Sequence, residues 1–126
     1  MNLENKKFLE LRKLFMTQQL DKDKAYIQDI LQACENCINF INQMTYEQFE
    51  KDLKTTSAVQ HQILIIGEVV KRVSQKLRND NPEIPWKAMA GMRDVLIHSY
   101  QSADFYEIWQ TVRKAMPELI LKLKKL

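Results

Sequence analysis

The sequence predicts an all-α protein, an up-and-down bundle of four to five helices. Only two glycines and three prolines occur among 126 residues, which favours long helices joined by short turns. Apolar residues recur at spacings of three and four along most of the chain, which is the period of an amphipathic helix. A chain of this length supports one compact core, so we expect a single domain over residues 21–126.

Residues 1–20 are predicted to form a helical appendage to that domain. Their apolar residues have helical spacing among lysines and arginines, but the polar stretch 18–23 separates them from the next apolar residues of the chain. The first main helix is then expected from about Lys22 to Gln43. Its apolar face consists of Ile27, Ile30, Leu31, Cys34, Ile38 and Ile41.

The middle of the chain indicates two further helices. Thr45 is expected to cap a short helix that ends near Leu53, and Thr55 or Thr56 to cap the next one. That next helix has the clearest apolar stripe of the chain and is predicted to continue to about Arg78. The stripe consists of Val59, Ile63, Ile66, Val70, Val73 and Leu77.

A turn with two prolines and two asparagines, RNDNPEIP, should end this helix. Pro85 suits the first turn of a helix that starts at Trp86 and reaches about Tyr100. Gly91 within that helix costs about 1 kcal/mol relative to alanine, so we expect a close helix contact there.

Asp104 is expected to cap the last helix, which Pro117 should bend or restart before the basic tail LKLKKL. The apolar face of this helix consists of Phe105, Ile108, Trp109, Val112 and Met116.

The net charge of +3 gives only weak attraction for nucleic acid, so any RNA contact must come from a local patch. No apolar run approaches the ~20 residues that span a bilayer, and the chain start does not resemble a secretory signal. The cytoplasm is therefore the expected location.

Cys34 and Cys37 form a C-x2-C pair, but no second cysteine pair completes a zinc site. We expect buried or half-buried free thiols, with metal or redox use as the alternative. His61 lies among glutamines on the polar side of its helix, which favours surface exposure.

The polar residues Arg93, Asp94, His98 and Tyr100 crowd into eight residues of an otherwise apolar helix. Metal-free cleavage of RNA needs a base for the 2′-hydroxyl, a proton donor for the leaving oxygen and positive charge near the phosphorane. An arginine and a histidine supply phosphate binding and proton exchange. Asp94 could orient either of them, and Tyr100 could position phosphate or ribose. A surface ion pair and a structural histidine are the alternative interpretation.

The spacing Arg93-x4-His98-x-Tyr100 matches the R-x4-H-x-Y signature of HEPN domains. Its setting, PEIPWKAMAGMRDVLIHSY, closely resembles the HepT-like toxins of toxin-antitoxin pairs. The segments DKAYIQDILQA and IIGEVVKRVS resemble the same family, so the resemblance covers roughly residues 21–123.

The resemblance implies a HEPN-like homodimer in which the motif helices pair and two Arg-His sets line one RNA-cleaving cleft. The catalytic residues would be Arg93 and His98, with Asp94 and Tyr100 in support, and without a metal or another cofactor. Asp94 departs mildly from the family, which commonly has another polar residue there, often asparagine.

The partner that the resemblance implies is an MntA-like nucleotidyltransferase antitoxin, which would silence the toxin by transferring AMP to Tyr100. The added charge and bulk would repel and block RNA. The alternative function is a non-catalytic HEPN module that binds a nucleotide or the nucleotidyltransferase.

Three further expectations concern residues around the motif. Gly67 is expected to make a close helix contact, and Glu68 to support the site through another residue. The basic run of Lys71, Arg72, Lys76 and Arg78 could follow RNA phosphates or form a solvated helix face. Apolar surface for dimerisation is expected from Trp86, Met89, Met92 and Leu96.

Overall fold

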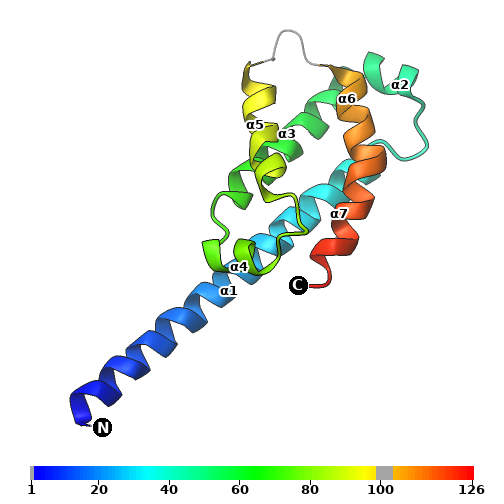
Figure 1. The fold of residues 1–126 in the computed structure, drawn as a ribbon. Helices are drawn as coiled ribbons and strands as arrows, with labels where there is room; N and C mark the ends of the chain where they lie inside the picture. The colour runs from blue at the N-terminus through cyan, green and yellow to red at the C-terminus, as the bar shows by residue number, and fades with distance from the viewer. Residues whose placement is uncertain (1, 99–103) are drawn as a thin grey trace.

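The computed structural model describes residues 2–98 and 104–126, and its regular elements there are all helical (Figure 1), which confirms the predicted fold class. Three long helices and a C-terminal helical run form the body, and two short helices connect them. The elements are α1 (Leu3–Phe40), α2 (Tyr46–Lys51), α3 (Leu53–Val70), α4 (Gln75–Asp80), α5 (Trp86–His98), α6 (Phe105–Gln110), the π-helical turn η2 (Thr111–Ala115) and α7 (Met116–Leu123).

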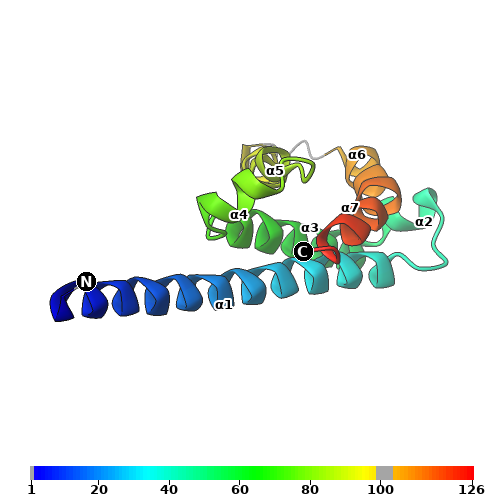
Figure 2. The ribbon, with the colours of Figure 1, turned by 60° about the horizontal axis from the view of Figure 1, so that its bottom comes forward.

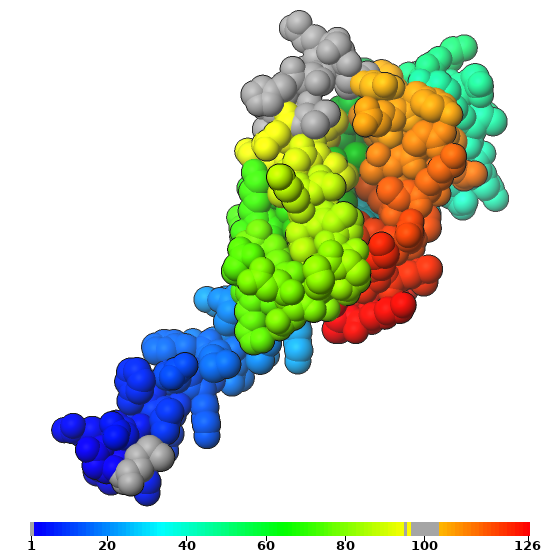
Figure 3. All heavy atoms as spheres, in the orientation of Figure 1, coloured from blue at the N-terminus to red at the C-terminus, as the bar shows by residue number. Residues whose placement is uncertain are grey.

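Helix α1 is continuous over 38 residues, and the polar stretch 18–23 does not interrupt it. Its second half carries the predicted apolar face, and the other helices pack on one side of it (Figure 2). Residues 2–22 are exposed and project away from the body (Figure 3). Because no glycine or proline occurs in this region, the change in polarity alters what the helix packs against and does not end it.

The cap predicted at Thr45 is confirmed, because Thr45 and Gln48 form a capping box. The Gln48 amide donates to Thr45 Oγ1 at 3.2 Å, and the Thr45 amide donates to Gln48 Oε1 at 3.0 Å. The cap expected at Thr55 or Thr56 is wrong. Asp52 accepts from the Thr55 amide at 3.2 Å, so this helix begins about one turn earlier.

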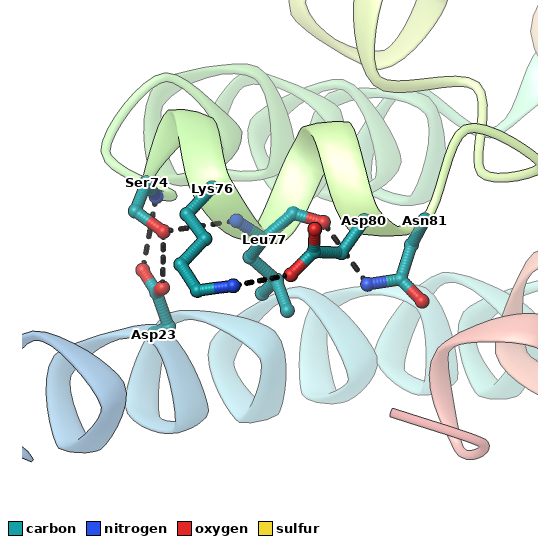
Figure 4. A network of polar contacts seen from close by, with 6 residues as sticks. All are labelled: Asp23, Ser74, Lys76, Leu77, Asp80 and Asn81. Carbon is teal, nitrogen blue, oxygen red and sulfur yellow. Dashed lines mark hydrogen bonds and ion pairs between the residues drawn. The ribbon is translucent and has the colours of Figure 1, made fainter.

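Helix α3 ends at Val70, and the predicted continuation to Arg78 is wrong. A turn comes next, and Ser74 then caps the separate helix α4. The buried carboxylate of Asp23 accepts hydrogen bonds from the Ser74 amide at 2.9 Å and the Ser74 hydroxyl at 2.5 Å (Figure 4). The apolar stripe still looks continuous because Val73, within the turn, is also buried.

The C-terminal run begins as predicted, with Asp104 accepting from the Glu107 amide at 3.1 Å. A π-helical turn precedes Pro117, and the Met116 amide donates to the Thr111 carbonyl. The wider turn fits a position where proline supplies no amide hydrogen, and α-helical geometry restarts at Met116. In the described ranges, no helix has an apolar stretch long enough to cross a membrane.

Candidate active site

The motif helix α5 is anchored to the core through its first turns. Pro85 precedes it, and the indole nitrogen of Trp86 donates to the Asn81 carbonyl at 2.9 Å. Trp86 and Met89 are buried. Arg93 follows Met89 by four residues, so the same helix face that enters the core continues toward α3 at Arg93.

This anchoring corrects the expected dimerisation surface. Trp86 and Met89 are already covered by their own chain, because their side chains belong to its core. Met92 and Leu96 are only partly buried and remain as apolar surface on the described part of α5. The expectation on the first two residues was wrong because an apolar face at helical spacing does not reveal which of its members the monomer buries.

Gly67 of α3 lies directly against Arg93 of α5. A β carbon built at position 67 would lie 2.6 Å from the β carbon of Arg93 and 3.4 Å from its backbone nitrogen. The predicted close contact at Gly67 is therefore confirmed, since any larger residue would push α5 away. The contact expected at Gly91 is wrong for the described part of the chain, where a β carbon at this position would meet no atom within 4 Å.

Glu68, the next residue of α3, forms an ion pair with the Nε of Arg93. Glu68 is therefore in direct contact with the motif arginine, while its expected supporting role in the site stays a prediction. The side chain of Arg93 is 35% exposed, and that of Glu68 is 46% exposed. Water and a ligand can therefore reach the guanidinium while the pair is formed.

A second ion pair lies beside the first and joins the residue that follows α3 to α5. The ammonium of Lys71 lies 3.9 Å from a carboxylate oxygen of Asp94. Within these two pairs, positive and negative charges balance. The partner role of Lys71 was missed from the sequence, although it follows Glu68 by three residues, which is about one helical turn.

The predictions for two site residues lie outside what the structure describes. Helix α5 ends at His98, whose side chain is not among the described ones, and Tyr100 falls between the two described ranges. The convergence of Arg93 and His98 on one phosphate therefore stays a prediction.

The remaining candidate residues behave as structural or surface groups. Cys34 and Cys37 are buried free thiols, as expected, and burial raises the pKa of each to about 12. His61 is exposed, also as expected. Among the described residues, no three His, Cys, Asp or Glu side chains gather in a group that could hold a metal ion.

A hollow of about 410 Å³ lies along α1 near the C-terminal end of the chain, and no residue of α5 lines it. Half of its lining residues are aliphatic, among them Leu31, Leu77 and Leu123, and most of the others are charged. It contains neither histidine nor arginine. The chemistry of the motif helix, and not the size of this hollow, therefore identifies the candidate active site.

Residues 30–126 match the sequence model of the family described as "Ribonuclease HepT-like". The chain belongs to this family. A protein of Thermococcus cleftensis named "Probable ribonuclease HepT" is 41% identical over 103 residues, which are 82% of this chain and 94% of that protein. A protein of Caldanaerobacter subterraneus subsp. tengcongensis named as a "Putative RNase" is 39% identical over 103 residues, 82% of this chain and 92% of that protein. No solved structure matches the chain.

The family match begins within α1 and covers every residue of the motif. It therefore covers Gly67 and Glu68 as well as Arg93, whereas the projecting part of α1 lies before it.

Proposed function

We propose that this member of the HepT-like family is a metal-independent endoribonuclease toxin of a HepT/MntA-type toxin-antitoxin system. The observation that carries the proposal is the partly exposed side chain of Arg93, the first residue of the R-x4-H-x-Y motif, in a chain that belongs to a ribonuclease family. Arg93 and His98 are the proposed catalytic residues, with Asp94 and Tyr100 in support.

The proposed chemistry is an internal transfer at the RNA phosphate. The ribose 2′-oxygen attacks phosphorus as its proton leaves, and the bond from phosphorus to the 5′-oxygen breaks as that oxygen gains a proton. The products are a 2′,3′-cyclic phosphate and a 5′-hydroxyl. Arg93 stabilises the charge on the phosphorane, and His98 exchanges protons with the reacting oxygens.

The test is cleavage of a labelled single-stranded RNA by the purified protein in EDTA. Arg93→Ala and His98→Ala are each expected to lower the rate by about 100-fold or more. Arg12→Ala and His61→Ala are matched controls, since both residues are exposed and lie outside the proposed site. Undiminished cleavage by both site variants would refute the proposal. Nucleotide or nucleotidyltransferase binding without cleavage would favour the non-catalytic alternative.

The proposed active form is a homodimer whose two motif helices line one cleft. Met92 and Leu96 supply the apolar surface that this pairing would cover. Light scattering at micromolar concentration should give twice the mass of one chain. A strictly monomeric protein that still cleaves RNA would contradict the shared cleft.

The proposed silencing step is transfer of AMP from ATP to the Tyr100 hydroxyl by an MntA-like nucleotidyltransferase, with release of pyrophosphate. Incubation with that enzyme and ATP should add the mass of one adenylyl group and abolish cleavage. Tyr100→Phe should remain unmodified. If the Tyr100→Phe variant is silenced as completely as the original protein, transfer of AMP to Tyr100 is not the silencing step.

A further inference from the structure

Two consecutive residues at the end of α3 are poorly suited to the helix that contains them. Glycine in a helix costs about 1 kcal/mol relative to alanine, and Gly67 stands in the last turn of α3. A carboxylate in the last turn is also disfavoured, because the helix dipole is negative at that end. Glu68 therefore gains nothing from its own helix at this position.

Both residues contact the same residue of the neighbouring helix. Gly67 allows the backbone of α5 to approach α3 at Arg93, and Glu68 pairs with the Nε of that arginine. The unfavourable choices at 67 and 68 are thus explained together by the position of one guanidinium group.

The atom that Glu68 engages matters for phosphate binding. Arginine has one N–H on Nε and four on its two terminal nitrogens. A carboxylate on Nε fixes the plane of the guanidinium and leaves terminal N–H groups as donors for phosphate oxygens. About one third of the Arg93 side chain is exposed while the ion pair is formed. A phosphate can therefore reach the guanidinium without displacing Glu68.

We infer that Glu68 is a positioning residue, which holds the Arg93 guanidinium in the orientation that meets the RNA phosphate. The inference rests on the proposed function and deepens it. The alternative is a restraining role, in which the Glu68 carboxylate blocks the Arg93 guanidinium and the RNA phosphate must displace it. The two roles predict opposite changes in the cleavage rate when the carboxylate is removed.

The decisive comparison is between Glu68→Ala and Glu68→Gln. Glu68→Gln keeps an oxygen that can accept from Nε, so its kcat should stay within about threefold of the original. Glu68→Ala should lower kcat by about 10- to 100-fold, because the arginine loses its fixed orientation. Its KM should stay equal or fall, since a negative charge near the phosphate has been removed. A faster Glu68→Ala enzyme would establish the restraining role and overturn the inference.

Glu35→Ala is a matched control for the charge change. Glu35 is 43% exposed and lies 4.0 Å from the ammonium of Lys124, so it too pairs with a separate helical segment. This variant should cleave RNA at the original rate. Thermal unfolding should show similar stability for all three variants, because exposed ion pairs contribute little.

Failure of this inference is distinguishable from failure of the proposed function. If Arg93→Ala and His98→Ala lose cleavage while Glu68→Ala keeps it, only the role of Glu68 is refuted. If none of these variants changes the rate, the proposed active site itself is refuted.

A measurement that does not depend on activity completes the test. Nitrogen-15 NMR of the Arg93 Nε–H group, assigned by its loss in Arg93→Lys, should show slow proton exchange with water in the original protein. Exchange should be faster in Glu68→Ala and intermediate in Glu68→Gln. An unchanged exchange rate in Glu68→Ala would mean that the pair does not orient Arg93 in solution.

Discussion

The β carbon of Arg93 lies where a β carbon on Gly67 would need space, at a separation of 2.6 Å. Because the obstructing atom is next to the α5 backbone, rotation of a flexible side chain cannot relieve the clash. The contact between α3 and α5 at this point therefore depends on glycine.

Gly67→Ala is accordingly expected to lower the free energy of unfolding by about 1–3 kcal/mol through overpacking. Cleavage of RNA should fall as well, since Arg93 would move with α5. Chemical denaturation measures the first effect. Gly91→Ala is the matched control and should be neutral or stabilising by up to about 1 kcal/mol, because a β carbon there meets none of the described atoms within 4 Å. Equal stability of both variants would contradict the close contact.

Asp23→Ala should lower the free energy of unfolding by about 2–3 kcal/mol. Asp23 is buried and accepts from Ser74 and from the side-chain amide of Gln19 at 3.1 Å, so its removal leaves the Ser74 donors without their acceptor. Urea denaturation measures this loss. Asp29→Ala, at an exposed position of the same helix, should change stability by less than about 0.5 kcal/mol.

Removal of residues 1–20 should leave the unfolding temperature of the body within about 2 °C of the original. The removed residues are exposed and the core begins beyond them; Asp23 loses its hydrogen bond from Gln19 but keeps both of those from Ser74. Differential scanning calorimetry on the two chains would measure the difference. A large drop would show that the projecting helix is covered in solution, for example by another molecule.

The two thiols predict how stability depends on alkaline pH. Burial raises the pKa of Cys34 and Cys37 from 9.0 to about 12, so the folded state keeps both protonated where the unfolded chain ionises. Their contribution to stability should be complete below about pH 9 and decline as the pH rises from there toward 12. Denaturation between pH 8 and 11 checks this, with Cys34→Ala/Cys37→Ala as the control. If stability instead fell as the pH was lowered from 11 to 8, the raised pKa of the two thiols would be contradicted.

Much of the fold could be predicted from local patterns. The cap at Thr45, the start of α5 after Pro85 and the cap at Asp104 each depend on residues adjacent in sequence. The break at Ser74 could not be predicted in this way. It depends on Asp23, which is 51 residues away in the sequence, and apolar periodicity persists across the break.

In the candidate site, too, local features could be predicted from the sequence and contacts between distant residues could not. The motif itself could be read from spacing. The cost of glycine in a helix applies to Gly67 and Gly91 alike, so that argument could not tell which of them makes a close contact. The pairings of Arg93 with Glu68 and of Asp94 with Lys71 are contacts between two helices, so they depend on the rotation of each helix about its axis. Spacing within one helix cannot fix that rotation.

The uninterrupted length of α1 has a hydrodynamic consequence. At ~1.5 Å per residue its 38 residues measure ~57 Å, whereas a compact chain of this size has a radius of gyration of ~14 Å and hence a diameter of ~36 Å. The frictional coefficient of a single chain will therefore be high for its mass, and the chain will elute early from a size-exclusion column. Elution volume alone would overstate the number of subunits, so the stoichiometry of this protein must be measured by a method that is independent of shape.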